Sequence, residues 1–151
     1  MQIRAISVDE PAVLALLRIH LEGMHAASPP GTVYALDTSG LRDAAITFWG
    51  AFDGDTLLGF GALKELDPRH GEIKSMRTHP DHLRKGVARV LLKHILATAR
   101  ARDYTRLSLE TGSGDAFEPA LALYRHAGFT NGAAFGDYAA SEFNQFLHLA
   151  L

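Results

Sequence analysis

The stretch Leu83-Arg84-Lys85-Gly86-Val87-Ala88-Arg89 lies where a strand pattern changes into a helical one. Residues 72–78 before it are typical of a β-strand, which Pro80 ends because proline cannot continue a strand ladder. Residues 86–102 carry apolar side chains at helical spacing. The first N–H groups of such a helix have no partner inside it, and the helix dipole adds partial positive charge there. The stretch therefore predicts an anion-binding turn between a strand and a helix.

The side chains of this turn favour a phosphate ligand. Gly86 and Ala88 are small, so backbone can approach the ligand closely, while three cations add full charges. Cations at a helix N-terminus oppose its dipole, and a bound anion would offset that cost. A solvated basic helix start with a glycine turn gives the same pattern, and this alternative stays open. The predicted phosphate-binding residues are Arg84, Lys85, Gly86, Val87, Ala88 and Arg89.

Two common phosphate-binding motifs do not fit this turn. A Walker loop requires Gly-Lys followed by Ser or Thr, whereas Lys85 precedes Gly86 and no Ser or Thr follows. A dinucleotide fingerprint requires a third glycine where Leu91 stands. The sequence therefore disfavours a nucleotide-binding protein of either class.

Length and composition set broader limits. The 151 residues, with 15 Lys plus Arg against 17 Asp plus Glu, predict one soluble domain over residues 1–151 with a net charge of −2. This balance argues against a broad nucleic-acid-binding face. The absence of cysteine excludes thiolate metal sites, disulfide scaffolds and cysteine nucleophiles. No export signal and no run of eighteen apolar residues occurs, so we expect a cytoplasmic protein with no membrane partner.

Periodicity predicts a mixed α/β domain. A helix near residue 10 is expected to be capped by Ser7 or Asp9 and to run to about Glu22. Residues 27–40 are aperiodic and are predicted to form a binding loop. Gly59 and Gly61 weaken their strand unless another backbone approaches there. Strands are predicted at residues 2–7, 45–52, 56–66, 72–78, 105–110, 129–130 and 143–149, and helices at residues 10–22, 86–102 and 116–127.

Two segments resemble the GNAT superfamily of N-acetyltransferases. The family signature is Arg or Gln, two residues, Gly, one residue, then Gly or Ala, and residues 83–88 match it at both small positions. Leu83 departs from it where Arg or Gln is usual, and the neighbouring Arg84 is the expected substitute. The second segment is Ala122-Leu123-Tyr124-Arg125-His126-Ala127-Gly128-Phe129. The resemblance covers nearly the whole chain and implies a mixed central sheet flanked by helices on both faces.

The resemblance also implies acetyl-CoA as cosubstrate. Its pyrophosphate would lie on residues 84–89, and its pantetheine arm would pair with the backbone of Met76, Arg77 and Thr78 like an added strand. The thioester would then lie between the strands at residues 72–78 and 105–110. Because no cysteine can carry the acetyl group, we expect an amine to attack in a ternary complex.

Such a reaction benefits from a base and an acid, because an alkyl ammonium must lose a proton and a thiolate leaves more easily when protonated. The resemblance makes Tyr124 the candidate acid, against the alternative of a packed tyrosine with a satisfied hydroxyl. Glu72 is the candidate base, against the alternative of a carboxylate paired with Lys74, or of water as the base. Period two predicts Glu72, Lys74, Met76 and Thr78 on one strand face.

The acceptor is the least defined feature. The resemblance implies a pocket built by the segment after the first helix and by the loop before the last strand, which here means His20, His25, Tyr34, Asp37 and residues 135–138. Glu110 is a further candidate at the end of its strand, and each of these residues is equally consistent with an ordinary loop or strand-end position. With no broad acidic patch, we expect a small-molecule amine, and the alternatives are a protein N-terminus or lysine, or a noncatalytic acyl-CoA-binding module. No metal is expected, since His79 and His82 lack further ligands. An exposed last strand would permit a homodimer.

Overall fold

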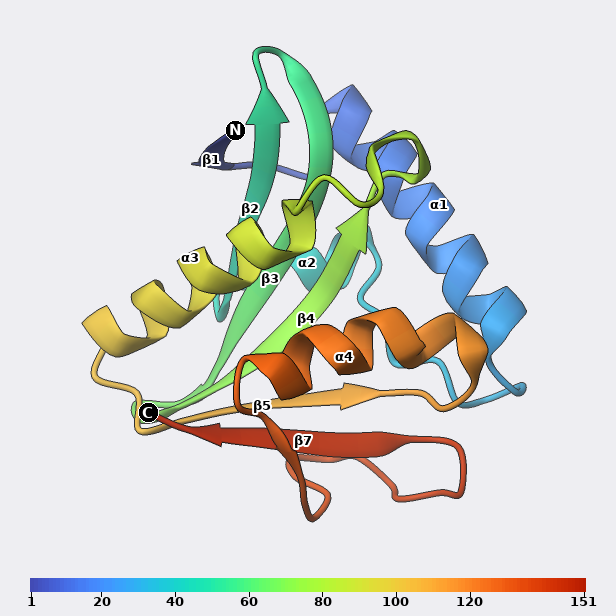
Figure 1. Ribbon diagram of the computed structural model, residues 1–151, viewed down its shortest axis with the longest axis vertical. Coiled ribbons are helices and arrows are strands. Elements are labelled where there is room, and N and C mark those ends of the chain that lie inside the picture. Colours follow the sequence, from blue (N-terminus) through green and yellow to red (C-terminus); the bar gives the residue numbers. More distant parts are fainter.

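The computed structural model describes residues 1–151. Its centre is one seven-stranded sheet with the order β1-β2-β3-β4-β5-β7-β6 (Figure 1). Strands β4 and β5 run parallel, and every other neighbouring pair is antiparallel. The strands are β1 (Gln2–Ala5), β2 (Ile46–Asp53), β3 (Thr56–Asp67), β4 (His70–Thr78), β5 (Arg106–Thr111), β6 (Thr130–Asn131) and β7 (Gln145–Ala150).

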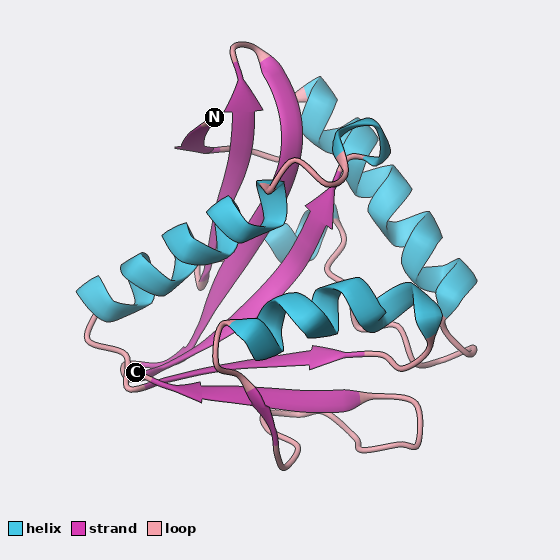
Figure 2. Cartoon of the chain, viewed as in Figure 1, coloured by secondary structure: helices cyan, strands magenta, loops and turns pink.

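Helices cover both faces of this sheet, which confirms the predicted mixed α/β architecture (Figure 2). They are α1 (Pro11–Ala27), α2 (Thr38–Leu41), α3 (Val87–Ala101) and α4 (Glu118–His126), with 3₁₀ turns at Pro80–His82 and Asp115–Phe117. Apolar residues of α3 and α4, such as Ile95 and Leu121, form one core with the sheet. Residues of α1, such as Leu16 and Leu17, form a second core with Phe60 of β3. No helix is both long and apolar enough to span a membrane.

Helix α1 differs from the prediction at both ends. It ends at Ala27 rather than near Glu22, because Met24 and Ala27 still pack against the core of the α3 and α4 face. Neither Ser7 nor Asp9 caps it: Glu10 is the N-cap residue and no side chain bonds the first N–H groups. The extra turn lengthens the wall of the pocket described below.

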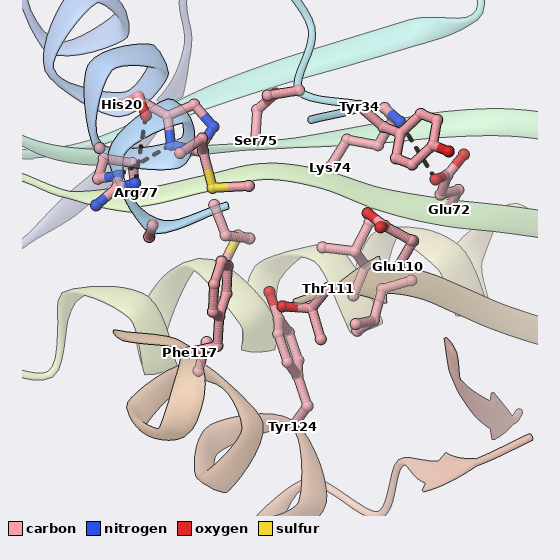
Figure 3. A pocket seen from close by; sticks show the side chains of 18 of the residues that line it. His20, Tyr34, Glu72, Lys74, Ser75, Arg77, Glu110, Thr111, Phe117 and Tyr124 are labelled. Carbon is pink, nitrogen blue, oxygen red and sulfur yellow. Dashed lines mark hydrogen bonds and ion pairs between the residues drawn. The ribbon is translucent and has the colours of Figure 1, made fainter. Parts of the chain in front are cut away.

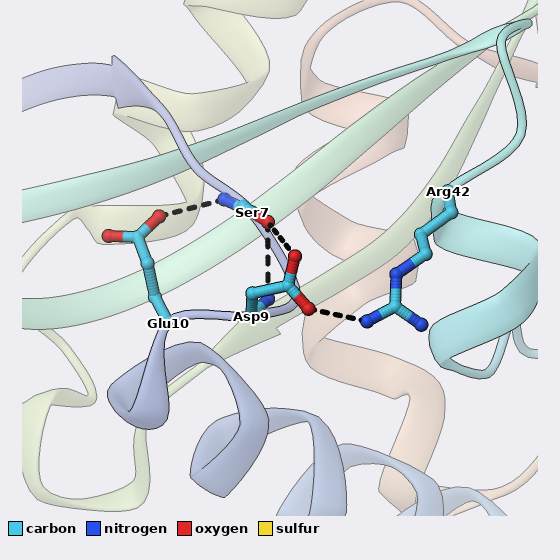
Figure 4. A network of polar contacts seen from close by, with 4 residues as sticks. All are labelled: Ser7, Asp9, Glu10 and Arg42. Carbon is cyan, nitrogen blue, oxygen red and sulfur yellow. Dashed lines mark hydrogen bonds and ion pairs between the residues drawn. The ribbon is translucent and has the colours of Figure 1, made fainter.

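Ser7 and Asp9, which were expected to cap α1, instead form polar contacts within the turn before α1 and with the residue after α2 (Figure 4). The Glu10 carboxylate accepts the Ser7 N–H at 2.7 Å, and the Asp9 carboxylate accepts Arg42 Nη2 at 2.5 Å. Arg42 lowers the pKa of Asp9 through this contact. Arg42 directly follows α2, a short helix that was not predicted inside the aperiodic segment.

The boundaries of the other helices and strands lie within two residues of those predicted. The strand expected at the edge of the sheet, however, is not at the edge. Strand β7 pairs with β5 at all six of its residues and with β6 at Leu147 and His148. The last strand is therefore internal, and the expectation of an exposed C-terminal edge strand is wrong. The outer strands are β1 and β6.

A β-bulge at Ser75 overturns the predicted face of β4. Lys74 pairs with Ala62 and Arg77 pairs with Phe60, so Ser75 and Met76 together lie opposite Gly61. Ser75 has a φ of 56°, a left-handed conformation that interrupts the period of two. Arg77 therefore shares the face of Glu72 and Lys74, whereas Met76 contacts Gly61 on the opposite, α3 face.

The same part of the sheet opens between β4 and β5. The two strands pair only where His70–Glu72 meets Arg106–Ser108, and beyond this point they diverge (Figure 1). The β4 backbone is held on its other side by β3, where a Cβ on Gly59 would lie 2.7 Å from the Arg77 carbonyl oxygen. Another backbone therefore does approach Gly59, whereas Gly61 makes room for the Met76 side chain. The divergence leaves one edge of β4 unpaired beside a cleft.

Candidate active site

The cleft between β4 and β5 is a pocket of about 210 Å³. Helix α1, the segment at Tyr34, helix α4 and Tyr138 complete its walls. Figure 3 shows His20 and Arg77 at one end, Glu72 and Tyr34 at the other, and Tyr124 rising from α4 between them. The pocket therefore brings together charged and hydrogen-bonding groups from both halves of the sequence.

Tyr124, the candidate acid, lines this pocket. Its side chain is buried and its ring meets that of Phe129 edge to face, with centroids 5.7 Å apart. Its hydroxyl has no hydrogen-bond partner in the protein, whereas the alternative interpretation expected a satisfied hydroxyl. Burial raises the pKa of Tyr124, so the phenol keeps its proton at neutral pH. Its hydroxyl is thus available to a ligand.

Glu72 is buried and fully engaged. The Tyr138 hydroxyl donates to its Oε2, and Lys74 Nζ lies 3.3 Å from the same oxygen. Lys74 Nζ also donates to the Tyr138 hydroxyl at 2.6 Å. Burial, with the adjacent Glu72 carboxylate, raises the pKa of Tyr138. The Glu72–Lys74 pair matches the structural alternative to a base, and the Tyr138 contact adds a partner 66 residues away.

Glu110 lines the same pocket and forms no ion pair. Its carboxyl group interacts with the side chain of Asn144. Burial raises the pKa of Glu110 to about 7, and the Glu72 carboxylate adds to this rise while Lys74 and Asn144 oppose it. A carboxyl group that titrates near neutrality can accept a proton from a bound ammonium. Glu110 was predicted as a substrate-binding residue, and the structure does place it at the cleft.

Arg77 reaches the pocket by its side chain as well as its backbone. Because of the bulge its guanidinium points to α1, where Nε donates to His20 Nδ1 at 2.9 Å and Nη2 approaches the His20 carbonyl oxygen at 3.4 Å (Figure 3). Burial, with the nearby Arg77 charge, lowers the pKa of His20 to about 3. The sequence prediction for Arg77 concerned its backbone alone, and its side chain lines the pocket in addition.

Because His20 is buried and neutral, we expect the folding stability of the protein to fall at acidic pH. Its pKa is lower in the folded state than the ordinary 6.5, so the unfolded chain binds the proton more strongly. Stability is then full above about pH 6.5 and falls as the pH drops towards 3. Lowering the pH from about 6.5 to 4.5 is therefore expected to reduce the free energy of unfolding by about 2–3 kcal/mol through this histidine. Urea unfolding of wild type and His20→Gln at these two pH values should show a smaller loss in the variant, and equal losses would contradict the assignment.

The predicted substrate residues separate into two groups. Tyr34 lines the pocket, with its ring edge to face with Tyr138 at 5.1 Å. His25 is exposed on the outer side of α1, in a shallow apolar groove away from the cleft. The exposed Asp37 caps α2 by accepting the Gly40 N–H at 2.8 Å. The structure therefore brings Tyr34 and Glu110 to the cleft but not His25 or Asp37.

The predicted phosphate turn is open to a ligand. Gly86 precedes α3 with a φ of 81°, and no side chain caps the first N–H groups of the helix. Nothing lies within 4 Å of the position where a Gly86 Cβ would stand. The cations Arg84, Lys85 and Arg89 are exposed, whereas the Val87 side chain is buried and leaves only its backbone to a ligand. Leu83 is 59% exposed, so it takes no part in the core.

Comparisons with known proteins identify the family of the chain. Residues 13–129 match the Acetyltransferase (GNAT) family. The chain is 52% identical to the uncharacterized N-acetyltransferase YsnE of Bacillus subtilis (strain 168), over 91% of each chain. It is 46% identical to the uncharacterized N-acetyltransferase YedL of Escherichia coli (strain K12), over 99% of this chain and 94% of YedL.

A solved structure has the same fold over almost the whole chain. It is described as a putative acyl-CoA N-acyltransferase of Klebsiella pneumoniae, with a TM-score of 0.79, 24% identity, and coverage of 99% of this chain and 97% of its own. The family match spans most of the chain and includes β4, the phosphate turn and Tyr124. The chain belongs to the GNAT acetyltransferase family.

Proposed function

We propose that the protein transfers the acetyl group of acetyl-CoA to the primary amine of a small molecule by direct attack in a ternary complex. One observation carries this proposal: the cleft between β4 and β5 holds both the unpartnered Tyr124 hydroxyl and the Glu110 carboxyl group, whose pKa is raised to about 7. Family membership and relatives named N-acetyltransferases support it. Structures of the same fold with CoA or acetyl-CoA bound support the cosubstrate.

The proposed cosubstrate binds mainly to two backbone features, which depend little on the identity of the side chains. The pyrophosphate binds the free N–H groups at the start of α3, with Arg84, Lys85 and Arg89 supplying positive charge. The pantetheine amides pair with the free edge of β4 at Met76, Arg77 and Thr78, where β5 no longer does. The Ser75 hydroxyl in the bulge is buried without a hydrogen-bond partner, and an amide of the bound pantetheine arm would supply one.

Glu110 is the proposed general base. An alkyl ammonium with a pKa near about 10.4 must lose a proton before its nitrogen can attack the thioester carbonyl. Glu72 already accepts from Lys74 and Tyr138, whereas Glu110 forms no ion pair and its pKa is raised to about 7. Glu72 then has the role of fixing Lys74 and Tyr138 at the acceptor end of the pocket.

Tyr124 is the proposed general acid. As the amine nitrogen bonds to the carbonyl carbon, the carbon–sulfur bond breaks and the electron pair goes to sulfur. The Tyr124 hydroxyl donates a proton to this thiolate, and the second proton lost by the attacking nitrogen restores the phenol. The products are an N-acetylated amine and the free thiol of CoA.

Ligand-induced stabilisation tests the cosubstrate. Acetyl-CoA and CoA at about 100 times their dissociation constants should stabilise the protein by about 2.7 kcal/mol, or roughly 5–10 °C in melting temperature. ATP and NAD at the same concentrations should give no comparable shift. A shift with ATP or NAD alone would contradict the proposed cosubstrate.

Thiol release separates an enzyme from a noncatalytic acyl-CoA-binding module, which the Leu83 departure keeps as the second candidate. The assay follows release of the CoA thiol with a panel of small amines, peptide N-termini and lysine peptides. Release that depends on a small amine supports the proposal. Release with peptides alone would redirect it to protein substrates, and binding without any release would support the sensing module.

A further inference from the structure

Arg77 is a half-buried cation with no anionic partner. Its guanidinium lines the cleft and contacts only the ring nitrogen and the carbonyl oxygen of His20. The four ion pairs of the structure involve Arg4, Arg42, Lys74 and His79, so no carboxylate lies within 4.0 Å of Arg77. Burial lowers the pKa of Arg77, with no nearby carboxylate to oppose it. The pocket therefore holds a positive charge that no protein anion compensates. Burying such a charge costs free energy.

His20 holds this cation without neutralising it. The histidine ring is buried, edge to face with Phe60, and uncharged at neutral pH. Because Nδ1 accepts from Arg77, it fixes the direction of the guanidinium and leaves the Nη1 groups without a protein partner. Gly23 permits the close approach to α1, since a Cβ there would lie 3.3 Å from Nη2. The arrangement orients a guanidinium towards a ligand.

The proposed phosphate site does not account for this charge. Arg77 pairs with Phe60 and therefore points to the α1 face, whereas α3 and its N-terminus pack on the other face of the sheet. Lys74, the other cation of the cleft, is already paired with Glu72. Arg77 alone is therefore free to bind an anionic group on the acceptor side of the cleft.

We propose that Arg77, oriented by His20, binds a carboxylate of the acceptor, so the substrate is a small amine that also carries a carboxylate group. A guanidinium presents parallel N–H donors that match the two oxygens of a carboxylate. The acceptor amine then lies towards Glu110, at the acidic end of the same cleft (Figure 3). This inference rests on the acetyl transfer proposed above and defines its substrate class.

The test compares acceptors that differ only in the carboxylate. Linear amino acids from glycine through β-alanine and γ-aminobutyrate to ε-aminocaproate, and the common α-amino acids, are each paired with the amine in which methyl replaces the carboxylate. In wild type, at least one carboxylated acceptor should exceed its matched amine by about 10- to 100-fold in kcat/KM. Equal use of both members of every pair would overturn the proposal.

The Arg77→Met variant keeps an unbranched apolar stem but removes the guanidinium and its charge. It should abolish the preference for the carboxylated acceptor over its matched amine, mainly by raising the KM for the carboxylated acceptor. Arg77→Lys keeps the charge without the fork and should fall between the two, and it carries the test if Arg77→Met does not fold. Arg18→Met, at an exposed position of α1, is the matched control and should behave as wild type.

Equal loss with both kinds of acceptor, or a raised KM for acetyl-CoA, would contradict the assignment and return Arg77 to the cosubstrate. A binding measurement separates this inference from the proposed function. With the protein saturated by CoA, carboxylated ligands should raise the melting temperature of wild type but not of Arg77→Met. Stabilisation without any thiol release would support the carboxylate site and contradict acetyl transfer. Thiol release without a preference for carboxylated acceptors would support acetyl transfer and contradict the carboxylate site.

Discussion

Glu110→Gln is expected to lower kcat by about 100-fold or more, the range of a lost general base. The pKa of this carboxyl group is raised to about 7, mainly by burial, and its active form is the carboxylate. In wild type, kcat should therefore rise with pH through about pH 7 and level off above it. The variant should lack this rise, because glutamine does not titrate. Initial rates at saturating acetyl-CoA and acceptor across this pH range measure both effects.

Two controls make this experiment specific. Glu142→Gln changes an exposed glutamate outside the pocket and should leave the pH profile unchanged. Glu72→Gln changes the carboxylate that already accepts from Tyr138 and Lys74, and should keep the rise near pH 7. If Glu110→Gln keeps the rise and Glu72→Gln loses it, Glu72 is the base and the present assignment is wrong.

Tyr124→Phe is expected to lower kcat by about 100-fold while the KM for acetyl-CoA stays nearly constant. The hydroxyl has no protein partner, so its removal leaves no unsatisfied group and the phenyl ring fits the same space. The melting temperature of the variant should therefore match or exceed that of wild type. Steady-state rates beside a thermal melt distinguish a chemical effect from a structural one.

The matched control for this substitution is Tyr104→Phe. The Tyr104 hydroxyl donates to Glu65 Oε1 at 2.8 Å, outside the pocket. Its loss should cost about 1 kcal/mol of stability and leave kcat unchanged. A Tyr124→Phe enzyme with full turnover would remove the phenol from the mechanism.

Local sequence features predicted most of the fold and the location of the proposed phosphate turn. Hydrophobic period located the helix after Gly86 and the core strands to within two residues, because those patterns are set by neighbouring residues along one element. The phosphate turn and Tyr124 lie in short contiguous motifs. The length of helix α1 was underestimated because its last turn packs through Met24 and Ala27, and these tertiary contacts leave no local pattern in the sequence.

The acceptor side of the pocket could not be predicted in the same way. One left-handed residue, Ser75, reverses the faces of the residues after it, and a serine gives little warning of a positive φ. Gly61 opposite the bulge was the available signal, since a strand glycine often marks such a site. The contact between Tyr138 and Glu72 joins loops and strands far apart in the sequence, which no local pattern encodes.

The most direct test of the account measures whether the thiol released from acetyl-CoA is matched by an acetylated amine. Wild-type protein is incubated with acetyl-CoA and the preferred small amine, and free thiol and product mass are quantified in the same sample. The account predicts one N-acetylated amine for each thiol released, and no thiol above background without the amine. Thiol release that does not depend on the amine, or the absence of an acetylated product, would contradict it.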